Sequence, residues 1–215
     1  MKKNQIYQEI KEKILSEKLA PGQWLVERDI SEKYKISRTP VRELLRALVS
    51  DGLISLEPSK GYYVRKLTIE EVIEIFQARE AIEGAATRLS CLRGDDSFFN
   101  HIAKLKSQFE KLDIQNDSLS GVVKGTELHI AIITAANNSI LSEFYQKLNN
   151  LNGLIRNLTK KSIKIETQSK QAHLNITQNI LDKKPKKSEQ CMRQHLSNTC
   201  KLLVEEYLKH QSGFM

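Results

Sequence analysis

The chain has 215 residues, of which 40% are apolar and 28% are charged, and its net charge is +8. This length and apolar content suffice to bury the core of one large domain or of two smaller ones. The chain contains no run of about eighteen apolar residues, so we expect no membrane-spanning helix, and its N-terminus does not resemble a signal peptide. Three scattered cysteines do not form a disulfide framework, so a reducing cytoplasm is the expected compartment.

Positive charge is concentrated in the N-terminal third of the chain. Residues 1–66 contain 14 Lys and Arg against 9 Asp and Glu, a net charge of +5, whereas residues 67–215 carry the remaining +3. A basic N-terminal part followed by a nearly neutral remainder is typical of proteins that bind a polyanion such as DNA. The charge alone is also compatible with a basic protein that has no such partner.

The first two expected helices are short. Apolar residues recur every four positions over residues 4–16 and indicate the first helix. Pro21 and Gly22 then break the chain, and a second helix is expected over residues 28–34.

The third expected helix begins at Ser37, a good N-cap because its hydroxyl can accept a free backbone N–H of the first turn. Pro40 falls at the third helical position, where a missing N–H costs nothing. Gly52 is expected to end the helix in the left-handed conformation. The apolar residues recur at helical spacing and form one face, made of Val41, Leu44, Leu45, Leu48 and Val49.

A small β-hairpin is expected next, because residues 53–56 and 62–65 are rich in apolar and aromatic side chains and flank a turn at residues 58–61. Three helices followed by such a hairpin make a winged helix-turn-helix, which is a DNA-binding fold. We therefore expect residues 1–66 to form a DNA-binding domain.

Three polar residues of the third helix have the positions of DNA-reading side chains. Arg38, Thr39 and Arg42 lie at its N-terminal end and off its apolar face, where a recognition helix contacts bases and phosphates. A guanidinium can pair with two acceptors on the edge of a guanine. The alternative for Arg42 is a surface ion pair with a nearby carboxylate.

Residues 67–215 indicate helices alone, because apolar side chains recur at helical spacing and no strand alternation appears. The expected helices cover residues 68–92, 97–115, 119–137, 139–159, 163–182 and 186–209. The expected fold class is mainly α, with an N-terminal winged helix-turn-helix and a C-terminal all-helical bundle.

With these elements in place, the sequence resembles the GntR family of bacterial transcription regulators, and within it the FadR-type subfamily that carries an all-helical FCD effector domain. Its motifs cover nearly the whole chain. They are found in residues 19–25, 27–30, 37–48, 52–54 and 60–64, and in Arg79, Glu80, Ile82 and Glu83 beyond the linker.

The resemblance implies a homodimeric regulator, without enzymatic activity, that binds operator DNA and responds to a small-molecule effector. Residues 67–215 would then bind the effector and form the dimer. The positions that match the DNA contacts of the family are Arg28, Ser37, Arg38, Thr39, Arg42, Lys60 and Gly61.

Three histidines, His129, His173 and His195, lie on the apolar faces of three different expected helices. Inward-facing imidazoles need partners, since an unpaired polar atom in a core is costly, and three converging imidazoles are a common zinc-type ligand set. His101 falls off the apolar face of its helix and is a poor ligand candidate.

The three histidines of this chain resemble the ligands of metal-binding FCD domains. Those domains carry three histidines with this pattern and an Asp four residues before the first histidine. That Asp position is Gly125 in this chain, so the anionic ligand is missing. A three-histidine site for Zn²⁺ or Ni²⁺ is one interpretation, with Cys191 as a further candidate ligand. The other is a metal-free effector cavity lined by hydrogen-bonded polar residues.

Arg79 also lies on an apolar face, and a buried Arg needs an anion. It is a candidate for holding an acidic effector, although Glu83, one turn further on, is the simpler partner. The leading interpretation is a ligand-responsive repressor, and the alternative is a regulator whose effector is the metal ion itself. A metalloenzyme would leave the DNA-reading helix unexplained.

Overall fold

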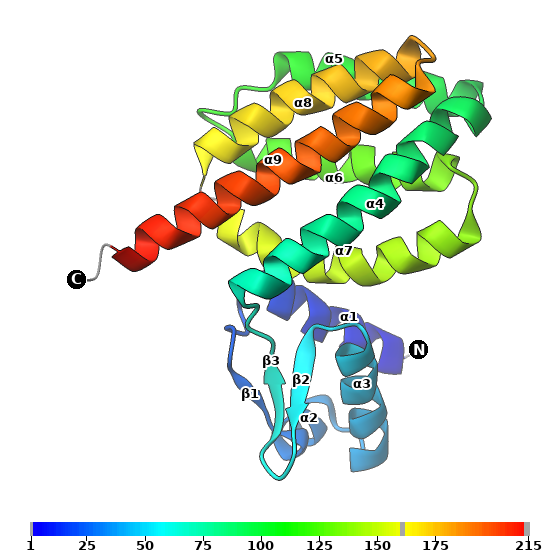
Figure 1. Cartoon of the computed structure of the whole chain (residues 1–215). Helices are drawn as coiled ribbons and strands as arrows, with labels where there is room; N and C mark the ends of the chain where they lie inside the picture. The colour runs from blue at the N-terminus through cyan, green and yellow to red at the C-terminus, as the bar shows by residue number, and fades with distance from the viewer. Residues whose placement is uncertain (1, 160–161, 213–215) are drawn as a thin grey trace. The chain divides into compact units, whose positions relative to one another are not determined.

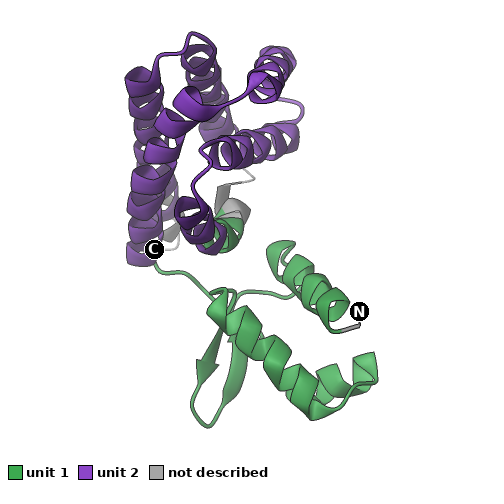
Figure 2. Cartoon of the chain, turned by 90° about the vertical axis from the view of Figure 1, so that its right-hand side faces the viewer, with its two compact units in different colours: residues 1–68, 149–157 green, residues 69–148, 158–215 purple. Residues whose placement is uncertain are grey.

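The computed structural model describes residues 2–159 and 162–212, which form helices and one small sheet (Figure 1). The chain divides into two compact units, one made of residues 1–68 and 149–157 and the other of residues 69–148 and 158–215 (Figure 2). The predicted mainly α fold is confirmed. Among the helices of the described residues, none is both long and apolar enough to cross a membrane.

The first unit contains three helices and a three-stranded antiparallel sheet with strand order β1-β3-β2. The predicted hairpin is present as β2 and β3, shifted by one residue. Strand β1 was not predicted, because two residues are too few to show a strand pattern. The elements are α1 (Lys2–Leu15), β1 (Trp24–Leu25), α2 (Glu27–Tyr34), α3 (Arg38–Ser50), β2 (Ile54–Glu57) and β3 (Gly61–Val64).

The apolar face of α3 forms the centre of the first unit's core. Four of its five predicted members are almost completely buried, and Val49 packs against their edge. Gly52 adopts a φ of +72°, so the predicted left-handed helix end is confirmed. The N–H of Leu53 donates to the carbonyl of Leu48 at 3.0 Å and that of Gly52 to Val49 at 2.9 Å, which closes the helix.

The second unit is built from helices. Within it α4 packs against α6 and α9, and α8 packs against α5, α6 and α9. Residues 149–157, in the last part of α7, belong to the first unit. The elements are α4 (Ile69–Arg93), α5 (Asp96–Lys111), α6 (Ser118–Ala135), α7 (Ser139–Thr159), α8 (Ile163–Leu181) and α9 (Pro185–Ser212).

Helix α5 ends at Lys111, four residues before its predicted end, so this boundary was wrong. The Asp113 carboxylate accepts a hydrogen bond from the N–H of Gln115 at 3.1 Å, which makes a local turn that competes with the helix. The other helices of the second unit begin and end within about three residues of their predicted bounds.

Candidate DNA-reading surface and histidine centre

The N-terminal end of α3 is open to solvent, with Ser37, Arg38 and Thr39 all exposed. Ser37 occupies the N-cap position with an extended backbone, but its hydroxyl makes no capping hydrogen bond, so that predicted contact was wrong. Water can satisfy the exposed N–H groups of a first turn, which leaves the hydroxyl available for other contacts.

Arg42 lies one turn further along α3 and is held by Glu27 at the start of α2. Its Nε donates to both carboxylate oxygens, at 3.1 and 2.9 Å. The surface ion pair that the sequence left as an alternative is therefore present. This ion pair is half-exposed, and exposed pairs contribute little stability. Arg42 can therefore exchange Glu27 for an acceptor on DNA. Arg28 is also exposed and lies 3.6 Å from Asp29.

The turn between β2 and β3 carries the other two predicted contact residues. Lys60 is exposed and its Nζ lies 2.6 Å from the Glu57 carboxylate. Gly61 has a φ of +108°, and no atom lies within 4 Å of the place where a Cβ would stand. A bare backbone in this position can approach a narrow groove closely.

The structure brings the three predicted histidines together in the second unit. His129 on α6, His173 on α8 and His195 on α9 are each less than a tenth exposed. Their ring centroids lie 4.6 to 5.5 Å apart, and one ligand atom from each lies within 4.8 Å of the others. The Nε2 atoms of His173 and His195 are 3.2 Å apart.

Glu83 on α4 connects this cluster to Arg79. One carboxylate oxygen accepts a hydrogen bond from Arg79 Nε at 2.6 Å, and the other contacts Nδ1 of His129. The carboxylate is completely buried. The partner that the sequence suggested for Arg79 is therefore present, whereas the contact with His129 was missed, because it joins residues 46 positions apart on different helices.

The protonation states follow from burial and from this ion pair. Burial acts to raise the pKa of the Glu83 carboxyl, but Arg79 and His129 outweigh it and lower this pKa to about 2. Burial, assisted by the neighbouring positive charges, lowers the pKa of His173 and of His195 well below the ordinary value. Both imidazoles are therefore neutral at pH 7, the form that binds a metal ion.

Gly125, which stands in place of an acidic ligand, lies directly against His173. A Cβ at this position would come within 2.6 Å of Cε1 of that ring. The His173 ring thus fills the space that a side chain on α6 would need. The observed position of the His173 ring therefore requires a residue without a side chain at position 125.

The spacing of two of the three histidines fits a divalent ion with imidazole ligands. Two nitrogens bound to one tetrahedral Zn²⁺ lie about 3.3 Å apart, close to the observed separation of the His173 and His195 nitrogens. A carboxylate on the far nitrogen of a ligating histidine fixes its tautomer and orientation, and Glu83 contacts His129 in this way. Cys191 instead accepts a hydrogen bond from Asn179 at 3.7 Å.

Comparison with known families identifies both units. The model described as the FCD domain matches residues 74–198, and the model described as bacterial regulatory proteins, gntR family, matches residues 2–64. The chain belongs to the GntR family. A GntR-family chain with an FCD domain is a transcriptional regulator that combines DNA binding with effector binding, and is not an enzyme.

Individual relatives of this GntR-family chain are also named as transcriptional regulators. The chain is 23% identical over 207 residues to the uncharacterized HTH-type transcriptional regulator YdhC of Bacillus subtilis (strain 168), and the alignment covers 96% of the chain and 90% of the relative. It is 25% identical over 198 residues to the HTH-type transcriptional repressor GlaR of Escherichia coli (strain K12), covering 88% of the chain and 90% of the repressor.

Solved structures share the GntR-family fold. The structure of E. coli McbR/YncC matches with a TM-score of 0.76 at 20% identity, covering 96% of this chain and 99% of that one. A putative GntR regulator from Rhodococcus sp. RHA1 matches with a TM-score of 0.77 at 19% identity, covering 94% and 97%.

Proposed function

We propose that this chain is a cytoplasmic, homodimeric repressor that releases its operator when a small acidic metabolite binds the second unit. Residues 1–66 would be the DNA-binding domain, and residues 67–215 the effector-binding and dimerisation domain. The observation that carries the proposal is the solvent-open end of α3, where Arg38, Thr39 and Arg42 surround an exposed first turn.

Each candidate DNA contact has a physical role. Arg38 and Arg42 lie one helical turn apart and can pair with guanine edges in the major groove. Arg28 would reach a phosphate, and Ser37 and Thr39 are short donors suited to phosphate or base contacts. The residues Lys60 and Gly61, in the hairpin of β2 and β3, would approach the neighbouring minor groove.

The charge balance of the histidine centre favours an acidic effector. Glu83 and Arg79 cancel each other, and His173 and His195 are neutral. A bound divalent ion would leave the centre with a net positive charge, which an anion can balance. Arg79 is a candidate effector contact, although its own charge is matched by Glu83.

We propose His129, His173 and His195 as ligands of one Zn²⁺ or Ni²⁺ ion. The bound ion would act as a Lewis acid that takes an effector carboxylate as a further ligand. Glu83 would hold the Nδ1 proton of His129 so that Nε2 faces the ion. Elemental analysis of untagged protein should find about one ion per chain, and His173→Ala should lose it. Metal-free wild-type protein that takes up no Zn²⁺ would contradict this assignment.

DNA reading is tested with operator sequences selected from a random pool. On the best selected duplex we expect the Arg38→Ala/Arg42→Ala variant to bind at least about thirtyfold more weakly, since each base-contacting Arg contributes about 1–3 kcal/mol. The control variant Lys147→Ala/Lys164→Ala removes the same charge from exposed sites in the second unit and should bind almost as wild type. Equal affinity of the two variants would contradict the proposed reading helix.

Affinity for the same duplex distinguishes two effector hypotheses, in which the effector is an acidic metabolite or the metal ion itself. Under the proposal, acidic metabolites weaken binding, whereas Zn²⁺ or Ni²⁺ alone leaves DNA affinity within about twofold. A large response to the ion without any organic ligand would instead make the ion the effector.

A further inference from the structure

The outward face of the three-stranded sheet carries one polar and aromatic residue from each strand. Trp24 on β1 lies opposite Tyr63 on β3, and Tyr63 lies opposite Ser55 on β2. Their neighbours Leu25 and Tyr62 are buried, because successive side chains of a strand point to opposite faces. Trp24 is 44% exposed, and its ring centroid lies 5.3 Å from that of Tyr63. We call Trp24, Tyr63 and Ser55 the outer row.

Each side chain of the outer row can donate a hydrogen bond, through an indole N–H, a phenol O–H or a serine O–H. In the part of the chain that the structure describes, none of these three groups has a hydrogen-bond partner. Water must therefore satisfy all three in the free protein. Trp and Tyr side chains that combine exposed ring area with an unpaired donor are typical of interaction surfaces.

Backbone hydrogen bonds hold the outer row in place. The N–H of Val64 donates to the carbonyl of Gln23 at 2.9 Å, and the N–H of Gly22 donates to the carbonyl of Val64 at 2.8 Å. Gly22 has a φ of +83°, which a glycine adopts without strain. Because β1 is fixed on β3 in this way, the row is already ordered before a partner binds, and binding loses little entropy.

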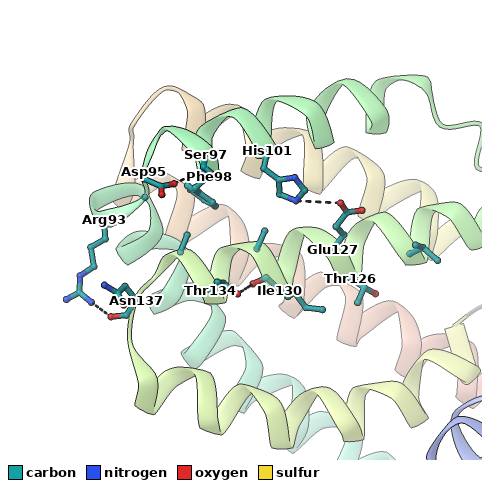
Figure 3. Close-up of a pocket in the computed structure, with 14 residues that line it drawn as sticks. Arg93, Asp95, Ser97, Phe98, His101, Thr126, Glu127, Ile130, Thr134 and Asn137 are labelled. Atoms are coloured by element: carbon teal, nitrogen blue, oxygen red, sulfur yellow. Dashed lines mark hydrogen bonds and ion pairs between the residues drawn. The ribbon is translucent and has the colours of Figure 1, made fainter. Parts of the chain in front are cut away.

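Polar side chains around a larger hollow differ from the outer row. This hollow, of about 740 Å³, lies between α5 and α6 in the second unit (Figure 3). At one end Arg93 Nη1 donates to the carbonyl of Asn137 at 3.2 Å, and towards the other His101 Nε2 lies 3.5 Å from the Glu127 carboxylate. These groups already have partners within the chain, whereas those of the outer row have only water.

We infer that the outer row binds the sugar–phosphate backbone of DNA beside the groove that Lys60 and Gly61 approach. Tyr63 follows Gly61 by two residues on one strand, so the row lies about 7 Å from that turn. Phosphate oxygens accept hydrogen bonds, and Ser and Tyr hydroxyls are among the usual donors to them. The indole N–H only donates, so it also suits an acceptor. The inference rests on the proposed DNA contacts of the hairpin and adds uncharged ones.

The charge around the outer row favours DNA as the partner. Residues 1–66 carry a net charge of +5, so the unit attracts a polyanion. The one carboxylate of the hairpin, that of Glu57, lies 2.6 Å from Lys60 Nζ, so it is compensated. No member of the row is charged or placed at the turn that enters the groove. We therefore expect the row to strengthen binding to every DNA sequence by the same factor.

Trp24 is the only tryptophan of the chain, so the fluorescence of the full-length protein reports on this position directly. Saturating duplex should lower the quenching of this fluorescence by acrylamide by about half or more, because the bound backbone covers the indole. Anisotropy of a labelled duplex verifies binding in the same samples. Equal quenching with and without bound DNA would place Trp24 outside the interface and overturn the inference.

The variant Trp24→Phe/Tyr63→Phe removes two donors and keeps both rings. We expect it to bind at least about tenfold more weakly to the selected duplex and to a scrambled duplex alike, because hydrogen bonds to charged groups are strong. The slope of log affinity against log salt should match wild type, since uncharged donors release no counterions. The control Tyr34→Phe removes a phenol that already donates to Glu9 at 2.9 Å, and should bind within about twofold of wild type.

Three results for this variant would overturn the inference. Affinity equal to that of the control would mean that the row does not touch DNA. A loss confined to the selected duplex would mean that the row reads bases. A flatter salt slope would mean that the substitutions displaced charged contacts. Failure of the proposed reading helix is a separate result, in which Arg38→Ala/Arg42→Ala binds as tightly as wild type.

Discussion

At the scale of single residues, Glu83 determines the electrostatics of the histidine centre. It is the buried carboxylate that contacts both Arg79 and His129. Removing one member of a buried charged cluster leaves the others uncompensated, and this costs far more than losing a surface ion pair.

We therefore predict that Glu83→Gln lowers the free energy of unfolding by about 3 kcal/mol. The control is Glu110→Gln, which breaks the exposed pair with Lys106, also four residues apart on one helix, and should cost less than about 0.5 kcal/mol. Urea denaturation of the metal-free full chain measures both. Equal, small losses would show that the Glu83 cluster contributes no more than a surface pair.

Gly125 provides a second prediction. Gly125→Ala should lower the free energy of unfolding by about 1–3 kcal/mol, because the new Cβ would displace the buried ring of His173. At Gly84 a Cβ would meet the Arg193 side chain at 2.8 Å, but that side chain is 37% exposed and belongs to an ion pair with Glu189 rather than to a buried ring cluster. Gly84→Ala should therefore cost less. If Gly125→Ala were as stable as wild type, His173 would not depend on the glycine.

The sequence predicted part of this site. Helical spacing alone placed His129, His173 and His195 on inward faces, and the structure brings them together. The contact between Glu83 and His129 depends on how α4 packs against α6, which no local pattern specifies. The resemblance to metal-binding FCD domains also indicated a missing acidic ligand at Gly125, but not that a histidine ring fills its place.

At the scale of elements, long periodic helices were predicted well and short or competing segments were not. The apolar row of α3 predicted its buried face, and Gly52 predicted its end. Strand β1 depends on pairing with β3, where Trp24 lies opposite Tyr63, so its formation is a tertiary effect. The early end of α5 depends on a side-chain hydrogen bond of Asp113 that periodicity does not detect.

The contact between α1 and the end of α3 predicts a dependence on alkaline pH. Tyr7 donates a hydrogen bond to the Asp51 carboxylate. Burial, then this bond and the charge of Asp51, raise the pKa of Tyr7 above its ordinary value of 10.0. In the unfolded chain the hydroxyl ionises near pH 10. This contribution to stability is therefore complete below that pH and is lost as the pH rises above it.

We expect wild type to lose more unfolding free energy than Tyr7→Phe when the pH is raised from about 9 to about 11, because the variant has no hydroxyl to ionise at this position. Denaturant titrations at both pH values measure the difference. Parallel losses in the two proteins would mean that Tyr7 ionises equally easily in the folded and unfolded states.

At the scale of the whole molecule, a DNA-binding unit and an effector-binding unit share one chain, and we propose that two such chains form a two-fold dimer. The GntR and FCD matches establish the two kinds of unit. The exposed end of α3 is the proposed reading surface. A dimer of this kind reads two equivalent half-sites, whose separation follows the helical repeat of DNA.

The most direct test of the account is a hydroxyl-radical footprint of the full chain on its selected DNA sequence. The account predicts two equivalent protected patches related by two-fold symmetry, with centres about one helical turn, or a whole number of turns, apart. Both patches should disappear with the Arg38→Ala/Arg42→Ala variant at the same protein concentration. A random pool that yields no preferred sequence, or uniform protection along the fragment, would contradict the central claim that this chain is a sequence-specific regulator.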